Sequence, residues 1–257
     1  MLDKRKFYIN GKWISASKPN DLDVINPSNE DPYAVISLGS KEDLDKAVQA
    51  AKIAFKSWKK TSKEERLKLL EKLLEIYKKR FKEMAKAISD EMGAPMDWAT
   101  DVQTGSGQAH LEDFILRLKK FKFEEHFDAK SNNHICYEPI GVCGLITPWN
   151  WPINQIALKV VPALATGCTM ILKPSEIAPI SGMLFAEMID EAGFPDGVFN
   201  LVNGDGAGIG TNISGHPDID MVSFTGSTRA GRLISKNAAD TIKRVCLELG
   251  GKGGNIV

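Results

Sequence analysis

The segment VCGLITPWNWPINQIALKVVPALATGCTMILKPSE, residues 142–176, decides the fold of this chain. Two short apolar runs, at 142–146 and 170–172, enclose a segment of helical length at 153–165. Short buried strands that alternate with helices indicate βαβ units, which wind right-handed into a parallel sheet with helices on both faces. We therefore predict an α/β fold with a doubly wound parallel sheet. Further strands are expected at 198–202, 221–224 and 245–249, and further helices at 180–192, 208–214 and 227–239.

The segment before residue 141 has a different pattern. Between 41 and 120 it is rich in charge and apolar residues recur every three or four positions, which predicts two or three amphipathic helices. Asp43 favours the start of the first helix, and Gly93-Ala94-Pro95 favours the end of the second. Residues 121–140 alternate weakly and contain Asn132-Asn133, which predicts a protruding β-hairpin that serves assembly rather than chemistry.

Composition and charge exclude several classes of function. The chain has 257 residues, of which 43% are hydrophobic, so it can bury a sizeable core as one large domain or two small ones. The 33 basic residues balance 33 acidic ones, which leaves no field to attract nucleic acid or an anionic membrane. No secretory or membrane-spanning segment is visible, because the most apolar stretch, 160–172, is interrupted by Thr and Gly.

Cysteine and histidine usage favours reduced thiols and no metal site. The four cysteines have no CxxC spacing and lie mostly in apolar runs, which is typical of buried thiols in a cytoplasmic protein. Cys143 and Cys168 fit core positions, and Cys246 is expected to face opposite Leu247 inside the sheet, so none is a convincing nucleophile. The four histidines are scattered without paired ligand spacing, so we expect no metal.

The candidate functional residues all follow the carboxyl ends of predicted strands. Ligands of parallel α/β sheets bind beyond this edge, so the shared placement predicts a nucleotide site. The five strands lead, in chain order, into Thr147-Pro148-Trp149-Asn150, Lys173-Pro174-Ser175-Glu176, Asn203-Gly204-Asp205-Gly206, Thr225-Gly226-Ser227 and Glu248.

Lys173 and Glu176 suit the binding of a ribose. The carboxylate can accept from a vicinal diol while the ammonium donates to the same oxygens, as acids after the second strand do in dinucleotide folds. The alternative is a surface turn in which Pro174 ends the strand and Glu176 caps a helix. A carboxylate here would also repel the extra phosphate of NADP, which favours NAD while leaving NADP possible.

Two glycine-rich segments are candidates for phosphate binding. Residues 204–210 form only a weak dinucleotide fingerprint, because one glycine is out of register and the segment follows the third strand. Residues 226–231 open a helix, where free N–H groups and the helix dipole favour a phosphate oxygen. Ser227 could equally be a simple N-cap. The Lys-Ser/Thr of a P-loop does not follow, so a nucleotide triphosphatase is not expected.

Asn150 and Glu248 are the candidates for chemistry. The Asn150 amide, fixed between two tryptophans and followed by Pro152, could donate to an oxyanion, a contribution of ~10²–10³ in rate in comparable sites. Glu248 follows an apolar strand, where burial would make its carboxylate a better general base. The alternatives are a turn asparagine and a carboxylate that caps a neighbouring helix.

Four motifs together carry a family resemblance. ITPWNWP (146–152), LKPSE (172–176), FTGS (224–227) and LELGGK (247–252) resemble, in order and spacing, the NAD(P)-dependent aldehyde dehydrogenase superfamily. The resemblance extends from YINGKW, residues 8–13, to the end of the chain. It implies a Rossmann-like NAD-binding core at 141–257, an oligomerisation-type hairpin at 121–140 and a helical part of the cofactor-binding domain at 1–120, with the catalytic domain absent.

The resemblance also implies a role for each site residue. Asn150 would be the oxyanion donor, Glu248 the base that activates the deacylating water, and Trp151 and Gln155 would line the aldehyde tunnel. The cofactor-binding residues would be Ile146, Thr147, Pro148, Trp149, Lys173, Ser175, Glu176, Gly206, Gly210, Phe224, Thr225, Gly226, Ser227, Leu249 and Gly250.

The reaction that the resemblance implies needs a nucleophilic cysteine, and none of the four motifs contains one. In the family a cysteine thiolate attacks the aldehyde, hydride passes to the nicotinamide, and the thioester is hydrolysed to a carboxylic acid. That cysteine lies beyond the position of Val257, so we expect that the chain alone does not oxidise aldehydes. Three hypotheses follow: the N-terminal part of an aldehyde dehydrogenase that is a homo-oligomer at full length, a noncatalytic nucleotide-binding chain, or a nonfunctional remnant.

Overall fold

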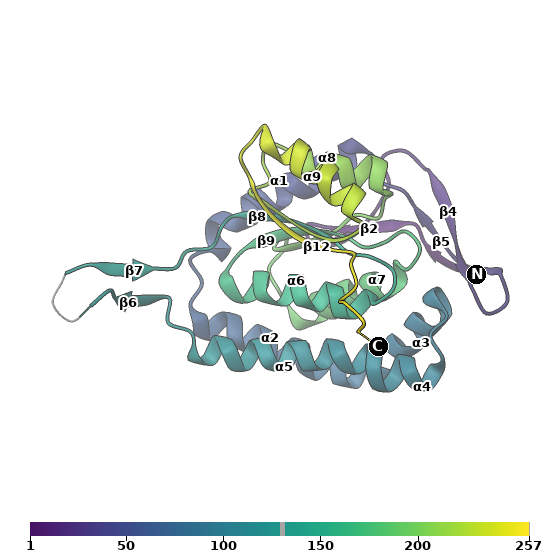
Figure 1. Ribbon diagram of the computed structural model, residues 1–257, viewed down its shortest axis with the longest axis horizontal. Coiled ribbons are helices and arrows are strands. Elements are labelled where there is room, and N and C mark those ends of the chain that lie inside the picture. Colours follow the sequence, from purple (N-terminus) through teal and green to yellow (C-terminus); the bar gives the residue numbers. More distant parts are fainter. Residues whose placement is uncertain (129–131, 257) are drawn as a thin grey trace.

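A seven-stranded sheet forms the centre of the computed structural model, which describes residues 1–128 and 132–256 (Figure 1). The strand order is β12-β11-β8-β9-β10-β2-β3. The first five strands are parallel, which confirms the predicted α/β fold, and β2 and β3 extend the sheet antiparallel. The bounds are β2 Lys6–Ile9, β3 Lys12–Ser15, β8 Val142–Ile146, β9 Thr169–Lys173, β10 Phe199–Leu201, β11 Met221–Gly226 and β12 Arg244–Leu249.

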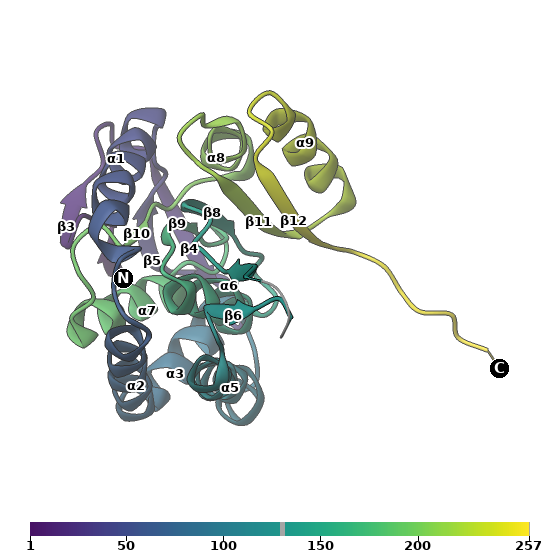
Figure 2. The same cartoon turned by 90° about the vertical axis from the view of Figure 1, so that its left-hand side faces the viewer.

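Helices cover both faces of this sheet (Figure 2). One face is covered by α1 (Lys41–Trp58), α8 (Thr211–Gly215) and α9 (Thr228–Ala239). On the other face α6 (Pro152–Thr166) and α7 (Ile180–Ala192) lie against the sheet. An outer helical layer packs on these two and consists of α2 (Lys63–Lys79), α3 (Phe81–Met92), α4 (Met96–Trp98), the π-helical turn Ala99–Thr104 and α5 (Gly105–Lys120).

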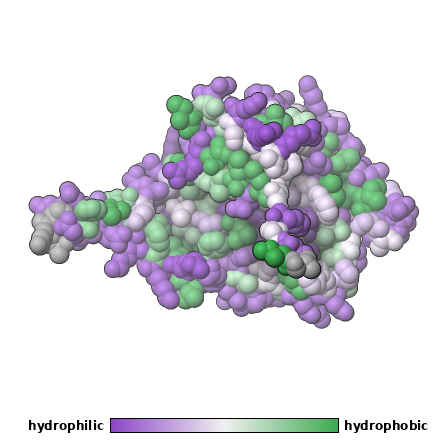
Figure 3. All heavy atoms as spheres, in the orientation of Figure 1, coloured by the Kyte–Doolittle hydropathy of each residue, from purple (hydrophilic) through white to green (hydrophobic). Residues whose placement is uncertain are grey.

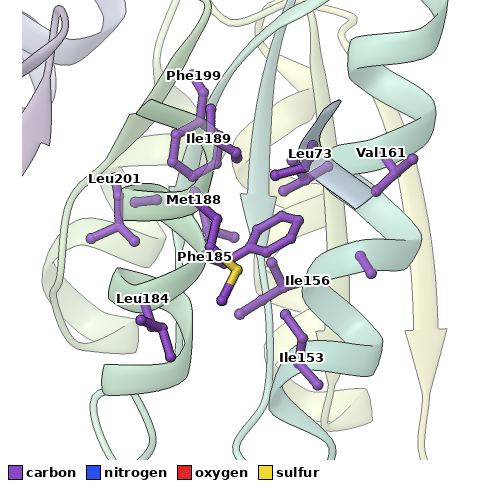
Figure 4. Close-up of a cluster of buried hydrophobic side chains, with 14 of the residues drawn as sticks. Leu73, Ile153, Ile156, Val161, Leu184, Phe185, Met188, Ile189, Phe199 and Leu201 are labelled. Carbon is purple, nitrogen blue, oxygen red and sulfur yellow. The ribbon is translucent and has the colours of Figure 1, made fainter. Parts of the chain in front are cut away.

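The main hydrophobic core lies between the sheet and this outer layer (Figure 4). Phe185 of α7 is fully buried and lies among Leu73 of α2 and Ile153 and Ile156 of α6. Each of these helices contributes apolar side chains to the core, and for α2 the period of three to four residues predicted this apolar stripe. The core therefore joins the helical segment before residue 121 to the strands after residue 141.

Capping groups explain where the helices begin and end. Asp43 is buried and accepts from the backbone N–H of Ser40 at 2.9 Å, which completes a capping box at the start of α1. Gly93, with φ +75°, ends α3. The predicted stop is therefore in the right place, but it ends the third helix, because a break at Arg80 separates α2 from α3.

The first 37 residues differ from the expected helical segment at 1–120, because they form strands. Besides β2 and β3, they contain β1 (Leu2–Lys4), β4 (Asp21–Asn26) and β5 (Asp31–Ser37), which form a separate three-stranded sheet of order β1-β5-β4. These strands are short and partners such as β2 and β10 are far apart in sequence, so no local period reveals them. The division into three domains stays a prediction.

The predicted β-hairpin between 121 and 140 is present. It consists of β6 (Glu124–His126) and β7 (His134–Cys136), which pair antiparallel and project from the molecule (Figure 1). Asn132 and Asn133, on which the expected turn was based, lie between the two strands, and residues 129–131 lie outside the described residues. In the described part of the chain no helix is long and apolar enough to cross a bilayer. No group of three potential ligands is arranged there to hold a metal ion.

Candidate functional site

The carboxyl ends of the parallel strands bring the predicted site residues to one edge of the sheet. In the pairing register, Ile146 at the end of β8 lies beside Lys173 of β9 and Phe224 of β11. Glu248 of β12 lies beside Thr225 of β11. Two pockets open at this edge, and we call them the nucleotide pocket and the amide pocket.

The nucleotide pocket, of about 390 Å³, lies between the sheet edge and the helices α8 and α9. Open space lies above the Cα of Gly206, so the backbone there is accessible to a flat ligand. The pocket's other lining residues include Ile146, Gly210, Phe224, Arg229 and Leu233. Four predicted cofactor-binding residues, Ile146, Gly206, Gly210 and Phe224, therefore line one pocket from three separate segments, whereas Arg229 and Leu233 were not among the predicted site residues.

Ser227 acts as the N-cap of α9. Its hydroxyl accepts from the backbone N–H of Ala230 at 3.2 Å. Gly226 precedes it, and a Cβ at this position would overlap the ring of Phe224. The structure therefore contains the N-cap that was the alternative for Ser227. The backbone N–H groups of Thr228 and Arg229, in the first turn of α9, have no partner within the helix.

The ammonium of Lys173 makes its hydrogen bonds within the protein. Its ammonium is buried and donates to Glu176 Oε2 at 3.0 Å, to the Pro174 carbonyl at 2.9 Å and to the Gly204 carbonyl at 2.5 Å. These three bonds use all three ammonium donors. Desolvation lowers the pKa of Lys173, and the Glu176 charge opposes that shift. Lys173 therefore positions Glu176, whose partly exposed carboxylate remains the group that can accept from a ribose. Ser175 is buried beside them and its hydroxyl accepts from the Ile177 N–H.

The amide pocket, of about 630 Å³, contains both residues proposed for chemistry. Asn150 and Glu248 line it together with Pro148, Trp149, Gln155, Thr225, Leu249 and Gly250. The backbone carbonyl of Asn150 accepts from the buried Gln103 at 3.2 Å, whereas no hydrogen bond of its side-chain amide is found within 1–128 and 132–256. The hydrogen bond to the backbone carbonyl thus positions Asn150, and the side-chain N–H₂ is available to donate a hydrogen bond.

Glu248 and Cys246 correct the expectation of a buried fifth strand. Both side chains are exposed and both line the amide pocket. The reason is the position of β12 at the edge of the sheet, where one face of the strand is left without a covering helix. Figure 3 shows apolar side chains gathered on one side of the molecule. Leu158 and Leu249 are exposed apolar residues that line the amide pocket.

Gln155 and Trp151 occupy different positions. Gln155 lines the amide pocket, where its Oε1 accepts from Thr225 at 3.1 Å. Trp151 lies beside the pocket and meets Trp98 edge to face, with the ring centroids 6.2 Å apart. Thr147 is buried and its hydroxyl has no partner among the described residues.

Two site residues were missed at the level of sequence. Lys159 of α6 lines the amide pocket and donates from its buried ammonium to Ser223 at 2.9 Å. Desolvation lowers its pKa, while the charges of Cys246 and Glu248 oppose this shift. A lysine within the apolar run of α6 was the available signal. Trp98 is half exposed beside Trp151, and no local pattern marks it.

A protein-family model matches this arrangement of motifs over most of the chain. It is described as the aldehyde dehydrogenase family and matches residues 13–257. The chain belongs to the aldehyde dehydrogenase family. The resemblance stated from the four motifs is therefore confirmed, and the family uses NAD(P) as its cofactor.

Individual aldehyde dehydrogenases support this membership. The chain is 53% identical to the 3-succinoylsemialdehyde-pyridine dehydrogenase of a Pseudomonas species, and the match covers 100% of this chain and 54% of the relative. It is 62% identical to an aldehyde dehydrogenase of Bartonella henselae, with a TM-score of 0.98 over 99% of this chain and 54% of that one. This chain thus spans about half the length of these aldehyde dehydrogenases.

Solved structures of other members contain a cofactor. A mutant of aldehyde dehydrogenase C from Pseudomonas syringae, solved with NAD⁺ and octanal, is 47% identical with a TM-score of 0.95. That match covers 98% of this chain and 51% of the Pseudomonas protein. Betaine aldehyde dehydrogenase from Staphylococcus aureus, solved with NAD⁺, is 35% identical with a TM-score of 0.92 over 96% of this chain and 50% of that one.

Proposed function

We propose that this chain binds NAD and supplies two catalytic groups for the oxidation of an aldehyde to a carboxylic acid. The observation that supports the proposal is the placement of Asn150 and Glu248 in one pocket, next to the nucleotide pocket along the same edge of the sheet. The dinucleotide would lie across this edge, as ligands of parallel α/β sheets do. Bound NAD would accept hydride from the substrate carbon.

The residues present fit a dinucleotide. Glu176, held by Lys173, would accept from the adenosine ribose. Gly206 and Gly210 would let the adenosine part approach the backbone, and the free N–H groups at the start of α9 would face the pyrophosphate. The buried hydroxyl of Thr147, which has no partner among the described residues, lies at the end of β8 where a further polar contact is available.

Asn150 and Glu248 would act on the substrate side. The free amide of Asn150 would donate to the aldehyde oxygen as negative charge develops on it. Glu248, exposed to solvent in the amide pocket, would take a proton from the water that hydrolyses the acyl intermediate. Gln155 and Trp151 would form part of the aldehyde path, together with Trp98.

The assembly and location of the protein are separate proposals. The projecting hairpin of β6 and β7 exposes Phe127 and Tyr137, which would pack against another subunit of a full-length homo-oligomer. Cys136 and Cys246 are exposed free thiols. Free surface thiols suit a reducing compartment, which supports a cytoplasmic location.

Calorimetric titration tests the cofactor site directly. We expect the purified chain to bind NAD saturably, and we expect Glu176→Gln to weaken NAD binding about tenfold, because a charge-assisted hydrogen bond to the ribose is lost. NADP should lose less, because the variant no longer repels its extra phosphate. Glu125→Gln, on the hairpin, is the control and should bind as the parent does. Equal affinities in all three proteins would mean that Glu176 belongs to a surface turn, and no binding by a folded chain would remove the cofactor proposal.

We expect no steady NADH formation when the purified chain is mixed with NAD and an aldehyde. Only Cys246 among the described thiols lines the amide pocket. It pairs in register with Ser223, two residues before the Thr225–Glu248 pair, so its Cα lies about 7 Å along β12 from that of Glu248, further from the carboxyl edge of the sheet. The nucleophilic thiol of the family reaction must then come from elsewhere. NADH absorbance gives the measurement, and Cys246→Ser gives the control: turnover that disappears in this variant would identify Cys246 as the nucleophile and contradict our assignment.

A further inference from the structure

Three hydrogen bonds join the outer helical layer to the amide pocket. Thr225 Oγ1 of β11 donates to Gln155 Oε1 at 3.1 Å, and Gln155 Nε2 donates to Asn154 Oδ1 at 3.3 Å. Asn154 Nδ2 lies 2.9 Å from Nε2 of His110 on α5. We call these four side chains the polar chain. It leads from the carboxyl edge of the sheet, across α6, to α5.

The two amides fix the direction of every hydrogen bond in the polar chain. Each amide has an oxygen that accepts and an N–H₂ that donates. Because Asn154 Oδ1 accepts from Gln155, Asn154 presents its N–H₂ to His110. Nε2 of His110 must therefore accept, so the neutral ring carries its proton on Nδ1.

Protonation of His110 removes the acceptor at the end of the polar chain. Both ring nitrogens then donate, so Nε2–H would face the N–H₂ of Asn154. The hydrogen bonds return when both amides turn over. His110 then donates to Asn154 Oδ1, and Asn154 Nδ2 donates to Gln155 Oε1. Gln155 Nε2 donates to Thr225 Oγ1, and the hydroxyl proton of Thr225 is released because its oxygen has become the acceptor.

The surroundings of His110 favour the neutral ring near neutral pH. Desolvation lowers the pKa of His110 below its ordinary value of 6.5, and the charge of Asp113, one turn further along α5, opposes this shift. Asp113 is itself paired with Arg117, at 2.6 Å. The reversal of the polar chain is therefore expected on the acid side of neutrality.

The other charged and titratable groups near α5 have partners of their own or are exposed. On α6 the one ionisable residue is Lys159, whose ammonium donates to Ser223. In the π-helical turn it is Asp101, which is exposed. Those of α2 that contact α5 or the π-helical turn are Tyr77, which donates to the Thr104 carbonyl, Lys78 and Glu71, which pair with Glu112 and Lys119, and Lys63, which donates to the Lys119 carbonyl.

We propose that His110 is a positioning residue for the amide pocket, whose protonation reverses the polar chain and releases the hydroxyl proton of Thr225 into that pocket. Thr225 lies beside Glu248 in the register of β11 and β12, and both side chains line the pocket. A hydrogen bond donated to the Glu248 carboxylate stabilises its charged form and makes it a weaker base. This last consequence rests on the proposed function of Glu248, whereas the reversal itself needs neither cofactor nor aldehyde.

Nuclear magnetic resonance of the isotope-labelled whole chain, without any ligand, tests the reversal. At alkaline pH the ring nitrogen shifts of His110 should show a proton on Nδ1. As the pH falls, the side-chain N–H₂ signals of Asn154 and Gln155 should shift with the same midpoint as His110. The N–H₂ of Gln108, which donates to Glu112 at 3.0 Å on the same helix, is the internal control and should not follow that midpoint.

Two results on the parent chain would overturn the proposal. One is a neutral His110 ring with its proton on Nε2, and the other is a Gln155 signal that does not share the midpoint of His110. Neither result depends on NAD binding. A chain that shows the shared midpoint but fails to bind NAD would keep this inference and lose the proposed function.

Matched variants separate the polar chain from other effects of pH. His110→Phe should abolish the shift of the Gln155 signal, whereas His126→Phe, on the exposed hairpin, should leave it unchanged. In Asn154→Leu the His110 ring should still titrate, but the Gln155 signal should no longer follow it. A signal that still followed would mean that the ring acts by its charge alone, contrary to the proposal. The midpoints in the parent need no substitution, so they decide the question even if a variant fails to fold.

Discussion

Replacement of Glu91 with alanine should lower the free energy of unfolding by about 3 kcal/mol, a large part of the stability of a domain of this size. Glu91 is buried in α3, and its carboxylate accepts from the backbone N–H groups of Ile180 at 2.5 Å and Ser181 at 3.1 Å. These two N–H groups lie in the first turn of α7. Pro179, at the N-cap position of α7, makes no side-chain capping hydrogen bond. A side chain from another helix therefore caps α7.

Urea unfolding of the parent and the variant measures this effect. Asp90→Ala is the matched control, because Asp90 is the neighbouring acid and forms a surface ion pair with the exposed Lys86. Its loss should cost at most about 0.5 kcal/mol. Equal losses for the two variants would mean that the buried cap contributes no more than a surface pair.

The protonation of Glu91 adds a pH dependence. Desolvation raises the pKa of Glu91 to about 7 in the folded protein, against 4.5 for an unperturbed carboxyl, although the bonds from Ile180 and Ser181 oppose the shift. Between these two values the folded chain binds the proton more tightly than the unfolded chain does. The contribution of Glu91 is therefore fully present below about pH 4.5 and is lost as the pH rises through about 7. Glu91→Gln should lack this dependence, so the stability difference between parent and variant should change across that window.

Lys173→Met should weaken NAD binding at least about tenfold and lower the free energy of unfolding by about 2–3 kcal/mol. The variant leaves the buried carbonyls of Pro174 and Gly204 without their donor and frees Glu176 from its partner. Gly204 lies two residues before Gly206, which lines the nucleotide pocket. The variant therefore also loses the hydrogen bond that connects this segment to β9.

Calorimetry and urea unfolding on the same variant measure both quantities. Glu176→Gln separates them, because it removes the ribose acceptor but keeps both carbonyl bonds of Lys173. It should lose affinity with a stability change of less than about 1 kcal/mol. If Lys173→Met bound NAD as tightly as the parent, Lys173 would have no role in positioning Glu176 for the cofactor.

The parallel half of the fold could be predicted from sequence because its signals are local. β8 occupies the predicted residues 142–146, and α7 the predicted residues 180–192. Apolar runs and helical periods lie within single elements, and Gly and Pro mark where elements end. The carboxyl ends of parallel strands lie at one edge of the sheet by geometry alone. The four motifs added the family, which the match over 13–257 confirmed.

Features that depend on contacts between segments far apart in the sequence could not be predicted from local patterns. The antiparallel extension by β2 rests on its pairing with β10, nearly two hundred positions along the chain. The exposure of Cys246 and Glu248 follows from the edge position of β12, while its apolar composition suggested burial.

The sequence by itself determined the parallel α/β core, the family and the residues that gather at its carboxyl edge, because these follow from local periods and short motifs. Only the tertiary structure decided what those residues can do. It showed that the three donors of Lys173 are used within the protein and that Glu91 caps a helix in another segment. Hydrogen bonding and desolvation depend on atoms that only folding brings together, so no local pattern contains them.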